Sequence, residues 1–162
     1  MTLLSAVLVA ALCAGFGESV LADPMPPGVA DPVRGKCPVS EDKVLLDVTV
    51  SGVHSSKGEV AITIYKGRKA FLAPHRKFER IRTPAAPTLD VCFELPGPGE
   101  FGIAIYHDED GNQKFNRTFV GLPNEGYGFS RDAPSSIGLP SYDDAKFTVK
   151  KGNNHQHITM RY

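Results

Sequence analysis

The stretch Phe101–Ser130, FGIAIYHDEDGNQKFNRTFVGLPNEGYGFS, contains both a strand and the start of an unusually long connection. Its first residues alternate, with Phe101, Ile103 and Ile105 on one face, which is typical of a half-buried β-strand. From 108 to 144 we find no further strand pattern, so we expect one long loop excursion packed over an end of the domain. The large apolar residues expected to hold this excursion down are Phe115, Phe119, Tyr127, Phe129 and Ile137.

Side chains with oxygen atoms recur at regular spacing after this strand. They are Asp108, Asp110, Asn112 and Asn116. The spacing matches positions 1, 3, 5 and 9 of a calcium-binding loop, so calcium is the cofactor that the pattern favours. The match is incomplete, because Gln113 replaces the glycine of loop position 6 and Phe119 replaces the closing acid of position 12. The alternative is an ordinary Asp- and Gly-containing turn without metal.

The same stretch resembles a family of secreted bacterial proteins of unknown function. The resemblance is carried by Tyr106-His107-Asp108, Asn112, Lys114, Gly121 and Glu125-Gly-Tyr-Gly-Phe-Ser130, and it extends from about Cys37 to the C-terminus. The sequence departs from the family pattern at Gln113, where Gly is usual, and at Asn116, where Asp is usual. The resemblance implies a small exported β-sandwich and no known reaction.

The rest of the chain also alternates in short runs separated by turns. Such runs occur at about 44–53, 60–64, 89–95, 145–150 and 155–162. They predict an all-β domain over 40–162, an antiparallel β-sandwich of about seven strands, immunoglobulin- or transthyretin-like. Because few residues separate the runs 44–53 and 60–64, we expect these two strands to form a hairpin.

The N-terminal region has the composition of an export signal. Residues 1–22 combine an apolar segment with small residues before Ala22, which predicts a cleaved signal peptide, and residues 23–39 form a Pro-rich lead-in. The apolar segment is too short for a comfortable membrane span, so we expect no transmembrane segment in the mature chain. The mature chain keeps Cys37 and Cys92, and two cysteines in an exported protein favour a disulfide. We therefore expect a secreted or periplasmic protein.

Charge narrows the class of partner. The 18 basic and 18 acidic residues balance, whereas a dedicated nucleic-acid binder usually carries a basic excess, so we expect no nucleic-acid partner. Most of the positive charge in the middle of the chain lies in segment 66–82. One interpretation is an anion-binding surface that uses Arg76, Lys77 and Arg80. The other is a charged edge strand that prevents edge-to-edge aggregation.

The catalytic motifs that we recognise are weak. Glu125 with Asp108 or Asp110 has the composition of a hydrolase carboxylate pair, but nothing in the sequence fixes their separation. The interpretation that we prefer is a non-enzymatic exported protein that binds a ligand, or an envelope or extracellular partner, through loop 107–130. Its expected ligand-binding residues are His107, Asp108, Glu125, Tyr127 and Phe129.

Overall fold

The computed structural model describes residues 32–135 and 138–162. Its strands are β1 (Val33–Arg34), β2 (Val44–Ser51), β3 (Glu59–Lys66), β4 (Glu79–Pro84), β5 (Thr88–Leu95), β6 (Gly99–Asp108), β7 (Tyr127–Phe129), β8 (Phe147–Val149) and β9 (Gly152–Thr159). A 3-10 turn η1 (Ser130–Asp132) and one helical turn α1 (Tyr142–Ala145) are the only helices in this part of the chain. The expected signal peptide, residues 23–31 of the lead-in and Ile137 lie outside the described residues.

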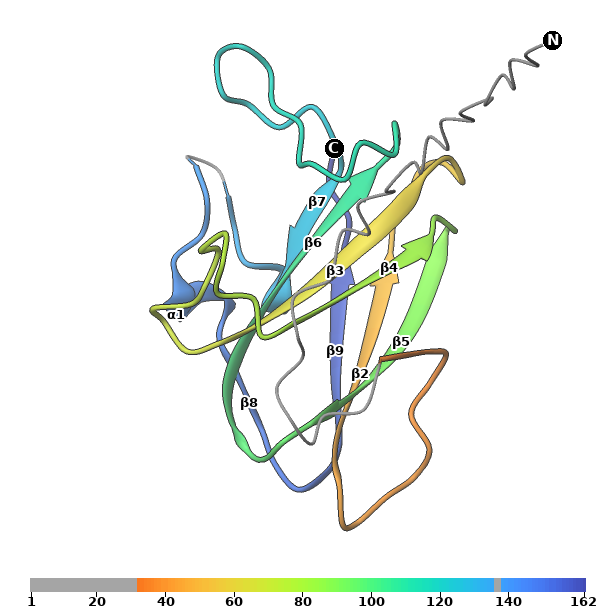
Figure 1. Ribbon diagram of the computed structural model, residues 1–162, viewed down its shortest axis with the longest axis vertical. Helices are drawn as coiled ribbons and strands as arrows, with labels where there is room; N and C mark the ends of the chain where they lie inside the picture. The colour runs from red at the N-terminus through yellow and green to blue at the C-terminus, as the bar shows by residue number, and fades with distance from the viewer. Residues whose placement is uncertain (1–31, 136–137) are drawn as a thin grey trace, which may run out of the picture.

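The strands form two sheets, which confirms the all-β sandwich (Figure 1). The first sheet has the order β1-β5-β2-β9, and the second has the order β4-β3-β6-β7 with β8 also paired to β6. Nine strands replace the seven expected, because β1 and β7 are too short to leave a pattern in the sequence. All named strand pairs are antiparallel except β2 and β9, which run parallel.

The core lies between the two sheets and is filled by the alternating residues of both. Its fully buried larger members include Leu46, Ile62, Ile64, Phe93, Phe101, Ile103, Ile105 and Ile158. Burial of such side chains stabilises the fold by about 1.5–3 kcal/mol each. The period of two in these strands therefore identified the buried faces correctly.

The hairpin expected between the first two long runs is wrong. β2 pairs with β5 and β9 in the first sheet, whereas β3 pairs with β4 and β6 in the second. Residues 52–58 cross from one sheet to the other. Position 58 requires glycine, because its φ is 67° and because a Cβ there would collide with the backbone of Asp108. Alternation identifies a strand, but it does not identify the partner of that strand.

Cys37 and Cys92 are joined by a disulfide, as predicted. Cys92 lies on β5, and β1 pairs along the edge of the same strand, with Val33 opposite Cys92. β1 therefore extends the first sheet at its edge. The chain then passes over the outer face of that sheet, where Cys37 N–H donates to Asp47 Oδ1 on β2 and Ser40 N–H donates to Asn153 Oδ1 on β9. Within the described ranges, no helix has the length and apolar character needed to cross a membrane.

Candidate functional site

The long excursion leaves the second sheet at the end of β6 and returns to it at β7. Figure 1 shows this excursion, residues 109–126, at the end of the sandwich where the C-terminus also lies. The crossing segment 52–58 joins them, since the ring of His54 stacks on Tyr162 at 3.5 Å between centroids. Three separate parts of the chain thus meet around the last residues of β6.

His107 fastens these parts together from inside the protein. Its side chain is fully buried, and both ring nitrogens have partners. Nε2 donates to the carbonyl oxygen of Lys57 at 2.7 Å, because a carbonyl can only accept. In the neutral ring this leaves Nδ1 to accept from the Tyr162 hydroxyl, also at 2.7 Å. His107 therefore holds the C-terminus and the crossing segment, and neither nitrogen is free for a ligand.

Asp108 is fully buried beside the excursion and points to a different set of partners. Its Oδ2 accepts from Arg82 Nη1 at 2.7 Å and from the backbone N–H of Gln113 at 2.8 Å. Its Oδ1 is buried and has no hydrogen-bond partner. Burial alone would lower the pKa of Arg82, but hydrogen bonds and the charges of Asp108 and Tyr106 outweigh it and raise that pKa.

Glu125 approaches Asp108 from the returning end of the excursion. Its Oε2 accepts from the backbone N–H of Asn116 at 2.9 Å, whereas its Oε1 is buried without a partner. Burial is the main cause that raises the pKa of Glu125, and the charges of Asp108 and Asp110 raise it further against the Asn116 hydrogen bond. Ligand atoms of Asp108, Asp110 and Glu125 all lie within 4.8 Å of one another.

Two asparagine amides complete this cluster. The Nδ2 atoms of Asn112 and Asn116 donate to Asp110 Oδ2 at 2.8 and 2.9 Å. The four residues expected around a cation do come together, and Glu125 lies beside them. The sequence did not indicate that Glu125 lies beside these residues, because Glu125 falls beyond the length of a single calcium loop that starts at Asp108.

Phe119 corrects another expectation. It was expected to pack the excursion down, but it is fully exposed, and Val120 and Leu122 beside it are largely exposed. These residues form the tip of a small hairpin, in which Thr118 N–H donates to the Leu122 carbonyl at 2.7 Å. Phe115, by contrast, does pack, with its ring edge against Tyr106 at 5.7 Å between centroids.

In the Gly-Tyr-Gly-Phe-Ser motif, the contacts of both glycines and of the serine explain why these residue types are needed. A Cβ at Gly126 would lie 2.5 Å from Tyr162 Cζ, and a Cβ at Gly128 would lie 2.9 Å from Ile158 Cγ2. Both glycines therefore let β7 press against the C-terminal strand. Ser130 is buried, where its Oγ accepts from Ile103 N–H at 2.9 Å and donates to the Ala145 carbonyl.

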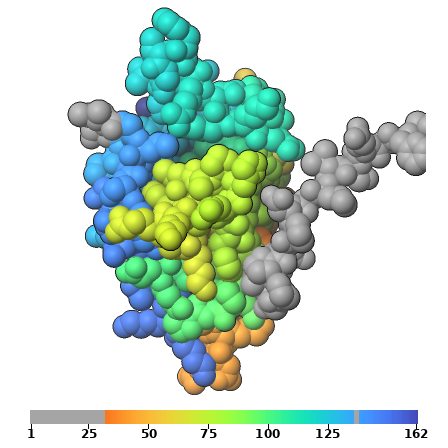
Figure 2. Space-filling model, turned by 60° about the vertical axis from the view of Figure 1, so that its left-hand side comes forward, coloured from red at the N-terminus to blue at the C-terminus, as the bar shows by residue number. Residues whose placement is uncertain are grey.

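The two aromatic residues of this motif line a pocket of about 180 Å³ on the outer face of the second sheet. Figure 2 shows this side of the molecule, where the teal excursion lies above the yellow-green segment that precedes β4 and beside the blue C-terminal part. The lining residues are Thr63, Tyr65, Leu72, Arg80, Ala104, Ile105, Tyr106, Phe115, Arg117, Tyr127, Phe129 and Leu139. The sheet supplies the floor, and the excursion contributes Phe115 and Arg117 to the wall.

The comparison with known families becomes informative at this point. A family model described as an uncharacterized protein conserved in bacteria, DUF2141, matches residues 48–157, which is more than half of the chain. The chain belongs to the DUF2141 family. No curated protein and no solved structure matches it. The matched DUF2141 range contains the acidic cluster and the pocket, and it confirms the resemblance seen in the sequence.

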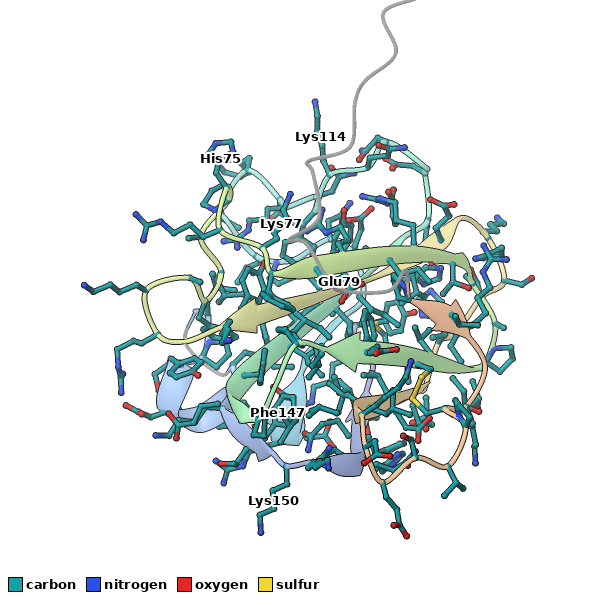
Figure 3. The ribbon with its side chains drawn as sticks, turned by 60° about the horizontal axis from the view of Figure 1, so that its bottom comes forward. His75, Lys77, Glu79, Lys114, Phe147 and Lys150 are labelled. Atoms are coloured by element: carbon teal, nitrogen blue, oxygen red, sulfur yellow. A yellow bond between two sulfur atoms is a disulfide. The ribbon has the colours of Figure 1, made fainter. Side chains whose placement is uncertain are left out.

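Two residues of the basic segment of this DUF2141 protein are paired with carboxylates. Arg68 pairs with Asp143 at 2.6 Å, and Arg82 pairs with Asp108. Arg80 faces the pocket from β4, which is the edge strand of its sheet, as one of the two interpretations expected. Figure 3 shows His75 and Lys77 together at one corner of the domain, and Lys114 at the same end.

Proposed function

We propose that this DUF2141 protein is an exported binding protein that holds a small organic anion with a planar or apolar body. One observation carries the proposal: the pocket is lined by five aromatic rings and two guanidinium groups, and by no acidic residue. Aromatic rings supply contact area with few rotatable bonds, and guanidinium groups match the geometry of carboxylate and sulfate. The combination favours a ligand with one negatively charged group.

The two cations are placed differently in the pocket. Arg80 is fixed by the sheet, because its Nε donates to Thr63 Oγ1 at 2.7 Å and its guanidinium lies over the Tyr106 ring. Arg117 comes from the excursion, where it lies over the Phe115 ring at 5.4 Å. Neither guanidinium forms an ion pair with a carboxylate among the described residues. Their charge is therefore available to a ligand.

The volume and chemistry of the pocket favour binding over catalysis. A cavity of about 180 Å³ is smaller than the ~300–1,000 Å³ typical of sites for drug-sized ligands, so the ligand we propose is small. The carboxylates of a hydrolase would have to reach a substrate, but Asp108 is fully buried and bonded to Arg82. A hydrolase would instead show turnover that Glu125→Gln abolishes, which a screen of ester and glycoside substrates would detect.

Benzoate and its neutral analogue benzamide provide a direct test. We expect benzoate, followed by two-dimensional NMR of the ¹⁵N-labelled protein, to shift amides of β6, β7 and the excursion. Benzamide should bind at least about tenfold more weakly, which corresponds to about 1.4 kcal/mol. Arg80→Gln and Arg117→Gln should each reduce benzoate binding.

Lys150→Gln is the matched control, because Lys150 points into solvent at the end of the domain opposite Lys114 (Figure 3). It removes one positive charge without touching the pocket. Equal binding of both probes, or equal loss in Arg80→Gln and Lys150→Gln, would contradict an anion site in this pocket.

The place of action that we propose is the periplasm or the extracellular space. The disulfide between Cys37 and Cys92 supports it, since such bonds persist mainly in oxidising compartments. Any larger partner would then be an envelope or extracellular component.

A further inference from the structure

We propose that Asp108, Asp110 and Glu125 form a calcium site at the neck of the excursion, separate from the anion pocket. The amide oxygens of Asn112 and Asn116 would complete its set of protein ligands. The site would join Asp108, which directly precedes the excursion, to Glu125 near its end, so that one ion closes the loop.

Two buried carboxylate oxygens lack a partner, which indicates a place for a cation. Asp108 Oδ1 and Glu125 Oε1 have no hydrogen-bond partner, whereas the second oxygen of each carboxylate is bonded. A buried polar atom without a partner costs about 1–3 kcal/mol, and more when it is charged. Both side chains are more than nine-tenths buried. A cation between these two oxygens would remove that cost.

The charges of the cluster lead to the same conclusion. Three carboxylates approach within 4.8 Å, and Arg82 is the cation that bonds to one of them. Arg82 is also shared with Glu59 at 3.7 Å, so it cannot neutralise the cluster alone. Like charges this close repel, most strongly between Asp108 and Glu125, which are buried, whereas Asp110 is exposed. A single divalent ion would balance the two negative charges that Arg82 leaves.

The donor atoms identify the ion as calcium. All five side chains offer oxygen, which hard cations prefer, and none offers the nitrogen or sulfur that selects zinc or copper. In the present geometry the amide N–H groups of Asn112 and Asn116 donate to Asp110. Asn112 Oδ1 accepts from Lys114 N–H at 2.7 Å and Asn116 Oδ1 accepts from Asn112 Nδ2 at 3.1 Å, so each amide would have to exchange these bonds to turn its oxygen toward an ion. This many protein oxygens on a loop suits calcium, since magnesium usually keeps several waters.

The neighbouring group of three possible ligands does not compete for the ion. It consists of His54, His107 and Glu109. Both nitrogens of His107 are already bonded, and His54 Nε2 lies 2.6 Å from Glu109 Oε1. The acidic cluster also opens to solvent, because Asp110 is exposed while Asp108 and Glu125 lie beneath it. An ion can therefore enter past Asp110.

Thermal unfolding of the full chain tests this site without any pocket ligand. Circular dichroism melts would be recorded in EDTA, in 10 mM calcium and in 10 mM magnesium. With a dissociation constant near 1 mM, within the extracellular range, calcium should raise the melting temperature by about 3–6 °C. Asp110→Asn should lose most of this rise, and it should fold because Asp110 is exposed. Asp42→Asn, an exposed aspartate on another loop, should respond like the wild type.

Glu125→Gln separates a cation site from a pair of carboxyl groups that share a proton. In EDTA it should melt at or above the wild type, because it removes repulsion, and in calcium it should melt below the wild type. If it melts above the wild type in both conditions, the cluster is a proton-sharing pair and the proposal is wrong. An unchanged wild-type melt, an undiminished response of Asp110→Asn, or an equal shift with magnesium would also overturn the calcium site.

Discussion

Gln113 shows how one residue can shape a loop through its backbone alone. It occupies the loop position where a calcium loop has glycine, and it adopts φ 63° all the same. Its N–H donates to Asp108 Oδ2, and its carbonyl accepts from the Tyr106 hydroxyl at 3.2 Å. The side chain at this position therefore departs from the calcium-loop pattern, but the backbone does not, since the turn that glycine would provide is still formed.

This arrangement leads to a stability prediction for Gln113→Gly. A non-glycine residue in the left-handed region is strained by about 1–2 kcal/mol, and glycine would relieve this strain. Glycine also loses more conformational entropy on folding, which offsets part of the gain. We expect the variant to be more stable by about 0.5–1 kcal/mol in urea unfolding. Lys114→Gly, on the exposed side chain that follows, is the control and should be neutral or destabilising. A loss of stability in Gln113→Gly would show that the side chain itself holds the loop.

At the residue scale, sequence spacing grouped the oxygen-bearing residues that are close in the chain and missed the distant one, while cation binding by this group stays a prediction. It brought Asp108, Asp110, Asn112 and Asn116 together, because their spacing lies within one turn-rich loop. It could not place the buried oxygens of Glu125 beside them, since only the return of the excursion to β7 does so. Aromatic character was also a poor guide to burial, as the exposed ring of Phe119 shows.

At the scale of elements, α1 is held by its buried residues Tyr142 and Ala145, and an exposed ion pair adds to this packing. Arg68 Nη2 lies 2.6 Å from both carboxylate oxygens of Asp143, which is a residue of α1. The hydrogen bond from Arg68 is the main cause that lowers the pKa of Asp143, and Lys146 contributes as well. Both partners are exposed, so the effect on stability is small and depends on salt.

The lowered pKa fixes the sign of a pH prediction. A carboxyl group whose folded pKa lies below its unfolded value stabilises the fold above about pH 3.8, and loses that contribution as the pH falls through the folded pKa. Asp143→Asn should therefore be less stable than the wild type at neutral pH, and the difference should vanish in acid. Urea unfolding at pH 7, 4 and 2.5 measures it. A difference as large at pH 2.5 as at pH 7 would mean that the substitution disturbs α1 in another way.

Long strands were predicted from the sequence, and short ones were missed. The eight-residue strands β2 and β5 each carry several alternating apolar residues, so their existence and buried faces were clear. β7 has only three residues, two of them aromatic around a glycine, and no period can be read from so few. The partners of strands were not readable either, because pairing depends on contacts made across the whole chain.

At the scale of the molecule, the disulfide ties the N-terminal segment to the first sheet. It joins residues 55 positions apart. Closing a loop of this size restricts the unfolded chain and stabilises the fold by about 2–4 kcal/mol. We expect reduction to lower the urea midpoint without changing the far-ultraviolet spectrum at low urea. Alkylation of the non-reduced chain 23–162 should add no mass, and two additions would refute the bond.

The parallel pairing of β2 with β9 bears on the order in which the protein can assemble. β2 is the first long strand and β9 is the last, and they are joined along their whole length from Val44–Gly152 to Ser51–Thr159. Contacts between such distant segments form slowly, because the entropy of closing the intervening chain must be overcome first. The first sheet cannot be completed until β9 has left the ribosome. Until then β2 has β5 along one edge and no partner along the other, so the first sheet of a nascent chain stays incomplete even where the second sheet has all its strands.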